Sequence, residues 1–233
     1  MPARGRQRTD STQVLAAVRV LNRLERVDET LRATLNSLAV VAPEWLREQA
    51  PEAWYERYSH RIENDPFPKT EAARQELAAL IGADGRQLLN VNAIKAAVDQ
   101  PWLQAVPTVK ILRQVWTEQY VEHEGKLRWR AIDERPAPAE LISSPYDPEA
   151  RYSTKRQVEW VGYKVHLTET GDPDTPPLIV NVETTPASTP PTITGPPSPR
   201  RPWRSAIGCR RSTWLIRVIP TPRFCSTVNR MIG

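Results

Sequence analysis

The chain has 233 residues, and its 32 lysines and arginines face 27 aspartates and glutamates, for a formal net charge of +5. No apolar run approaches the ~20 residues that a membrane-spanning helix needs. The first residues are basic but lack the apolar core of a signal peptide. No cysteine precedes Cys209, so the first 208 residues offer no disulfide and no thiolate metal site. We therefore expect a cytoplasmic protein with no membrane partner.

The last fifty residues differ in composition from the rest. From Thr184 to Gly233 the chain has no Asp and no Glu, but it has eight Arg, nine Pro and both cysteines. Without these eight arginines, 24 basic residues would face 27 acidic ones, so the basic character comes from this segment alone. Its proline density blocks helices and ladders, and its arginines lack acidic neighbours. We predict a disordered tail over 190–233.

The first half of the chain has helical periodicity, which predicts an all-helical domain over 10–124. Asp10 or Ser11 can cap its first helix, and Gly82 and Gly85 are expected to end a later one. Prolines begin two short segments. The expected helices are 10–41, segments beginning at Pro43 and Pro51, 70–81, 88–98 and 109–120. The apolar stripes place four tryptophans in the core: Trp45, Trp54, Trp102 and Trp116.

After His123 the pattern changes from helical to alternating. A short strand is expected over 126–130, and strict alternation predicts a strand over 160–168. A Gly-Asp-Pro-Asp turn then leads to an apolar strand over 178–182. The strands over 160–168 and 178–182 are expected to form a hairpin, which needs partner strands or a helix to be stable. The fold class is therefore α+β, with helices first and strands second.

Single residues with functional chemistry have ordinary structural explanations. Arg19, Arg23 and Arg26 lie near one helix face, but acidic residues beside them favour a solvated face over a DNA-reading helix. Asp147 precedes a proline, and taken alone an Asp-Pro pair is usually a turn. The three histidines are far apart in sequence and favour solvated or structural roles over metal ligation: His60, His123 and His166.

Several segments together resemble one protein family. The most specific is ISSPYDPEARYSTKR over 142–156, which continues through 160–170 and 181–187. Shorter segments over 10–17, 21–25, 43–46 and 54–58 add to it. These segments are similar to bacterial insertion-sequence transposases of the DDE type. The resemblance covers 10–190 and ends there.

The resemblance implies a ribonuclease-H-like catalytic domain, of which 125–189 would supply only the opening strands. In such transposases two Asp and one Glu bind two Mg²⁺ ions that activate the attacking oxygen and stabilise the leaving oxygen. The first Asp would be Asp147, as catalytic residue and metal ligand, with Asp172 and Asp174 as weaker candidates. The second Asp and the Glu should follow, where this chain has neither residue type. We therefore expect no productively bound Mg²⁺.

A shift of reading frame after about residue 190 would explain the loss. Read in another frame, the codons of Leu215 and Ile216 can encode the Asp of a VDxGY pattern typical of these transposases. The implied partners are the DNA of the element ends and a second copy or a full-length transposase. Three interpretations stay open: an enzyme completed by frameshifting, a DNA-binding regulator, and a decayed product without function.

Overall fold

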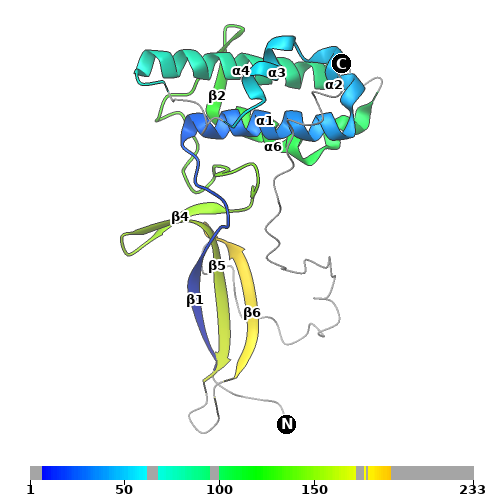
Figure 1. Ribbon diagram of the computed structural model, residues 1–233. Coiled ribbons are helices and arrows are strands. Elements are labelled where there is room, and N and C mark those ends of the chain that lie inside the picture. Colours follow the sequence, from blue (N-terminus) through cyan, green and yellow to red (C-terminus); the bar gives the residue numbers. More distant parts are fainter. Residues whose placement is uncertain (1–6, 62–67, 95–99, 172–175, 177, 190–233) are drawn as a thin grey trace. The chain divides into compact units, whose positions relative to one another are not determined.

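The computed structural model describes residues 7–61, 68–94, 100–171, 176 and 178–189, and it mixes helices with strands (Figure 1). The predicted disordered tail, Asp172 and Asp174 lie outside these residues. The chain groups into two compact units, which are described separately. One unit joins residues 13–163 to 186–188, and the other takes the described residues among 1–12, 164–185 and 189.

The larger unit is built around α1 (Arg23–Val41), which begins at a capping box. The Asn22 side chain accepts hydrogen bonds from the amides of Leu24 and Glu25, while the Glu25 carboxylate accepts one from the Asn22 amide. Four helices pack against or beside α1, and most of its residues are buried. They are α2 (Pro43–Gln49), α3 (Glu52–Tyr58), α4 (Glu71–Ile94) and α6 (Pro107–Gln119), with the 3₁₀ turn η2 (Pro101–Ala105) before α6.

The predicted first helix begins thirteen residues too early. Residues Gln7–Leu15 form strand β1, and the helix starts only at Arg23. The apolar residues Val14 and Leu15 are exposed, so their helical spacing does not report a buried helix face. The expectation of an all-helical N-terminal domain is wrong at this point because pairing with a distant strand overrides a local pattern.

Helix α4 continues through the two glycines that were expected to end it. The rings of Tyr120 and Trp116 pack so closely there that a Cβ at Gly82 or Gly85 would lie 2.5 Å or 2.0 Å from them. The Trp116 indole donates to the Gly82 carbonyl at 3.0 Å, and the Tyr120 hydroxyl donates to the Ala78 carbonyl at 2.7 Å. These glycines therefore permit close packing rather than a helix end.

Three of the four tryptophans expected in the core are buried: Trp45, Trp54 and Trp116. Trp102 is the exception and is 48% exposed on η2. The core of this unit also takes Tyr120 from strand β2 (Tyr120–His123), which pairs with β3 (Lys126–Trp129) across a Glu124-Gly125 turn. The predicted domain boundary between 124 and 125 falls inside this turn, so a cut there would separate two paired strands.

Strands from both ends of the described chain share one sheet. Strand β4 (Arg151–Lys155) pairs antiparallel with β5 (Val158–Thr170), and β1 and β6 (Ile179–Pro186) also pair with β5. The predicted hairpin of 160–168 and 178–182 is confirmed. Gly162 has φ of +153°, and a Cβ there would lie 2.1 Å from the Val14 carbonyl oxygen. The N-terminal strand β1 is therefore a partner of β5 that no local sequence pattern predicts.

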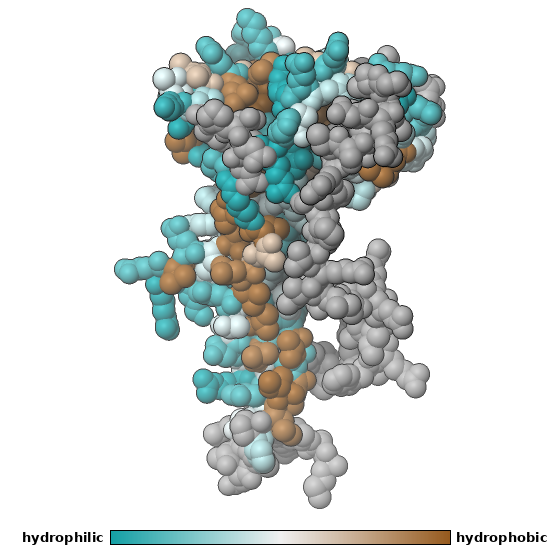
Figure 2. Space-filling view, in the orientation of Figure 1, coloured by the Kyte–Doolittle hydropathy of each residue, from teal (hydrophilic) through white to brown (hydrophobic). Residues whose placement is uncertain are grey.

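The smaller unit carries an apolar surface on its strands. Thr9 of β1 meets Thr168 of β5 through hydroxyls 2.9 Å apart, and the buried His166 ring lies 3.0 Å from the Thr185 hydroxyl. Four consecutive or near-consecutive apolar residues are exposed on or just before β6: Leu178, Ile179, Val180 and Val182. Figure 2 shows hydrophobic side chains gathered in a band along the strands.

Candidate functional site

Asp147 lies in a loop that is held to the helical core before this residue and to strand β4 after it. Before it, the Ile142 amide donates to the Glu118 carboxylate at 3.1 Å, and Ser143 and Ser144 are buried. After it, the Arg151 guanidinium donates to the Pro148 carbonyl at 2.6 Å. The segment 142–156 is therefore a packed part of the larger unit.

Tyr146 joins this loop to α1 through a buried ion pair. Arg32 donates two hydrogen bonds to the Glu29 carboxylate at 2.8 and 2.6 Å, and the Tyr146 hydroxyl donates to the same carboxylate at 2.5 Å. Burial and the Glu29 contact raise the pKa of Tyr146 to about 12. Burial opposes ionisation of Glu29, but the bonds from Arg32 and Tyr146 outweigh it and lower the pKa of Glu29.

The Asp147 carboxylate itself is partly exposed and faces β5. Its Oδ1 accepts hydrogen bonds from the Tyr163 hydroxyl at 2.5 Å and from the Ala150 amide at 3.2 Å. Burial and the bond to Asp147 raise the pKa of Tyr163. Among the residues that the structure describes, no group of three or more His, Cys, Asp or Glu is placed to hold a metal ion.

Replacing Tyr163 with Phe should lower the free energy of unfolding by about 1 kcal/mol, since a partly buried carboxylate loses its strongest donor. Urea unfolding followed by tryptophan fluorescence measures this. Tyr152→Phe is the matched control on the neighbouring strand, because its hydroxyl meets the exposed Glu159. An equal effect of the two substitutions would contradict the anchoring role of the Asp147–Tyr163 bond.

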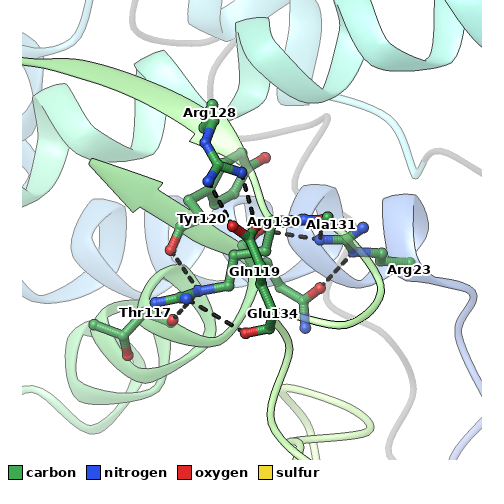
Figure 3. Close-up of polar contacts among 8 residues, drawn as sticks. All are labelled: Arg23, Thr117, Gln119, Tyr120, Arg128, Arg130, Ala131 and Glu134. Atoms are coloured by element: carbon green, nitrogen blue, oxygen red, sulfur yellow. Dashed lines mark hydrogen bonds and ion pairs between the residues drawn. The ribbon is translucent and has the colours of Figure 1, made fainter. Parts of the chain in front are cut away.

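Arg23, at the start of α1, is held inside a polar cluster between α6 and β3 (Figure 3). It donates to the Gln119 side chain at 2.7 Å, to the Gln119 carbonyl at 3.1 Å and to the Arg130 carbonyl at 2.8 Å. Its guanidinium lies 3.8 Å from the centre of the Trp129 ring. Burial, and next the charge of Arg135, lower the pKa of Arg23 to about 10.

Two further arginines complete the cluster drawn in Figure 3. Arg130 donates to the Tyr120 carbonyl at 2.9 Å and to the Thr117 carbonyl at 3.1 Å, where α6 ends and its carbonyls lack helical partners. Arg128 forms a two-pronged ion pair with Glu134 at 2.7 and 2.6 Å. The bond from Arg128, followed by that from the Ala131 amide, lowers the pKa of Glu134 to about 2.

The solvated arginine face expected over residues 19–26 does not form. Arg19 pairs with Glu25 at 2.5 Å ahead of the helix, whereas Arg23 and Arg26 turn into the protein. Burial lowers the pKa of Arg26, and the Arg135 charge adds to this effect. Sequence reasoning missed Arg135 and Gln119, because they reach this cluster only through the α6–β2–β3 connection.

The histidines stay in structural or exposed positions, as predicted for ordinary side chains. His166 is buried against Thr185, His60 lies beside the Ser59 hydroxyl, and His123 is exposed at the end of β2. Within the described ranges, no helix is both long and apolar enough to cross a membrane.

Comparison with known proteins found no similarity above the level of significance. No protein-family model, no curated protein and no solved structure matches the chain.

Proposed function

We propose that the chain is a truncated DDE-type transposase that binds DNA without cutting it. The observation that carries the proposal is the placement of Asp147. It lies directly before three strands that follow one another in sequence, with β4 and β6 both paired to β5. An acidic residue beside the opening strands of a sheet is what the resemblance of 142–187 to transposases implies.

The carboxylates around Asp147 do not fit a pair of Mg²⁺ ions. Mg²⁺ takes six oxygen ligands, commonly with one or two carboxylates for each ion, and two-ion catalysis needs ligands for both. The Asp147 Oδ1 already accepts two hydrogen bonds, and within the described residues no further ligand completes the set. No acidic residue follows Glu183 in the sequence. Binding to DNA is therefore the part of transposase function that this chain can retain.

Purified protein should bind duplexes taken from the two ends of the DNA element that encodes it, and should leave them uncut with Mg²⁺ or Mn²⁺. Mobility shifts measure binding, and denaturing gels measure cleavage. Asp147→Ala should leave binding within about twofold, because a carboxylate does not attract the negatively charged DNA backbone. Metal-dependent cleavage that Asp147→Ala abolishes would show an enzyme, and absence of any shift would contradict the proposal.

A further inference from the structure

Strand β6 is an open edge of the four-stranded sheet. Among the described residues it pairs with β5 on one side and with no strand on the other. Figure 1 shows β5 between β1 and β6, so the free side of β6 faces away from the sheet. An edge of this kind presents backbone N–H and C=O groups, and it can take up a further strand.

The side chains at this edge are apolar and exposed on both faces of the sheet. Leu178, Val180 and Val182 alternate on one face and are 62%, 41% and 60% exposed. Ile179, on the other face, is 62% exposed. Glu183 shares the face of Ile179 and is exposed, without a hydrogen bond or ion pair to any other described residue. The segment that best covers this edge is therefore extended, largely apolar and positively charged on one face.

One segment that follows the described residues has this composition. Residues 213–219 read TWLIRVI, and each of them except Arg217 is aromatic, aliphatic or β-branched. In an extended chain, Trp214, Ile216 and Val218 lie on one face, whereas Arg217 lies on the other. The pattern thus matches the apolar face and the acidic face of β6.

We propose that residues 213–219 of the same chain pair with the open edge of β6 as a further strand. The face of Trp214 then covers the face of Val180 and Val182, and Arg217 lies on the face of Glu183. Apolar cross-strand pairs and opposite charges on one face stabilise a sheet. No acidic residue follows Glu183 in the sequence, so none within 184–233 competes for Arg217.

This pairing gives order to a part of the tail that composition alone predicts to be disordered. It depends on the open edge and on the composition of 213–219. It does not rest on the proposed binding of DNA.

The connection is long enough for the segment to reach β6. Residues 190–212 place 23 residues between Thr189 and Thr213. A proline-rich chain of this length can span about 70 Å, whereas the eight residues of β6 extend over about 26 Å. A parallel partner needs a connection of about a dozen residues and an antiparallel partner needs fewer, so either direction is possible.

The tethered segment is a better partner for the edge than a second copy of β6. A tether holds the segment near the edge at an effective concentration of about 1 mM. Two β6 strands side by side would bury a strip about 26 Å long and about 10 Å deep. This strip is well below the ~800 Å² per partner that a stable dimer usually buries.

The test is hydrogen exchange of the full chain, measured by mass spectrometry on the peptide that contains β6. Its outward amides should exchange at least about tenfold more slowly in wild type than in a variant with Leu215→Pro and Ile216→Pro. Adjacent amides of a strand point to opposite sides, so one of the two prolines must remove a donor to β6. Thr227→Pro with Val228→Pro is the matched control, because it places the same two prolines outside the segment.

The control should exchange as slowly as wild type at β6. Equal exchange of wild type and the Leu215→Pro, Ile216→Pro variant would refute the pairing. Protection that disappears on dilution, together with a dimer in sedimentation, would show that a second copy covers the edge and would overturn the proposed occupant.

Trp214 gives a second measurement that does not depend on the proline variants. The chain has eight tryptophans, and the emission of wild type minus that of Trp214→Phe isolates this one. Uncharged acrylamide should quench it at least about twofold less than a free tryptophan amide, because the indole packs on the side chains of β6. Quenching equal to that of the free amide would show that the segment does not lie on the sheet.

Discussion

Replacing Glu29 with Ala should lower the free energy of unfolding by about 3–5 kcal/mol, because it leaves a buried guanidinium without its carboxylate. The Glu29 and Arg32 side chains are only 7% and 10% exposed, and Tyr146 has its hydroxyl on the same pair. Small domains are stable by about 5–15 kcal/mol in total. This single change should therefore remove a large share of the total stability.

Urea unfolding at neutral pH measures the loss, and Glu48→Ala is the control because Glu48 is exposed on α2. A double variant, Glu29→Leu with Arg32→Met, should recover much of the stability, since it removes both charges. The hypothesis of a buried pair fails if Glu29→Ala alone is as mild as Glu48→Ala.

The pH dependence of this difference has a definite sign. The folded-state pKa of Glu29 is lowered, so its contribution is present above the unfolded pKa of about 4.3. It is lost as the pH falls through the folded value. The gap in stability between wild type and Glu29→Ala should therefore narrow below about pH 4, and a gap that widens in acid would contradict the ion pair.

Replacing Gly85 with Ala should destabilise the protein by about 2 kcal/mol or more, although the same change in an open helix stabilises by about 1 kcal/mol. The new Cβ would lie 2.0 Å from Cζ2 and 2.3 Å from Cε2 of Trp116. The indole cannot retreat freely, because it donates a hydrogen bond to the Gly82 carbonyl of the same helix. Either the ring or α4 must move.

The reverse substitution, from Ala to Gly, at a nearby position of α4 is the control. Ala83 is exposed on the same turn of α4, so Ala83→Gly should cost only the helix propensity, about 1 kcal/mol. Chemical unfolding of the two variants compares them directly. A stabilised Gly85→Ala protein would show that the Trp116 contact does not limit this position.

The sequence by itself determined the elements whose signals are local. Prolines at 43 and 51 do begin or precede helices, and the alternating residues of 160–168 do form the central strand. The predicted strand over 126–130 is present as β3. These predictions succeed because ring-fixed dihedrals and residue alternation act within a few positions.

The sequence also identifies Asp147 as a candidate site residue, but it does not predict which residues contact Asp147. Tyr163 follows Asp147 by sixteen residues and reaches it only because β4 and β5 turn back on each other. The sequence predicts a solvated face for these arginines because Arg19, Arg23 and Arg26 fall near one face of a predicted helix. The true neighbours of Arg23 and Arg26, Gln119 and Arg135, lie more than ninety residues away in the chain.

Only the tertiary structure determines that residues 7–15 form a strand and that α4 continues through its two glycines. The first segment has helical spacing yet forms a strand, because β5 offers it a partner and Gly162 leaves room for its backbone. The glycines resemble a helix end, yet α4 passes through them because the rings of Trp116 and Tyr120 need the missing side chains. In both places, contacts with distant residues contribute more free energy than the local conformational preference of a few residues. That preference amounts to about 1 kcal/mol for each glycine in a helix.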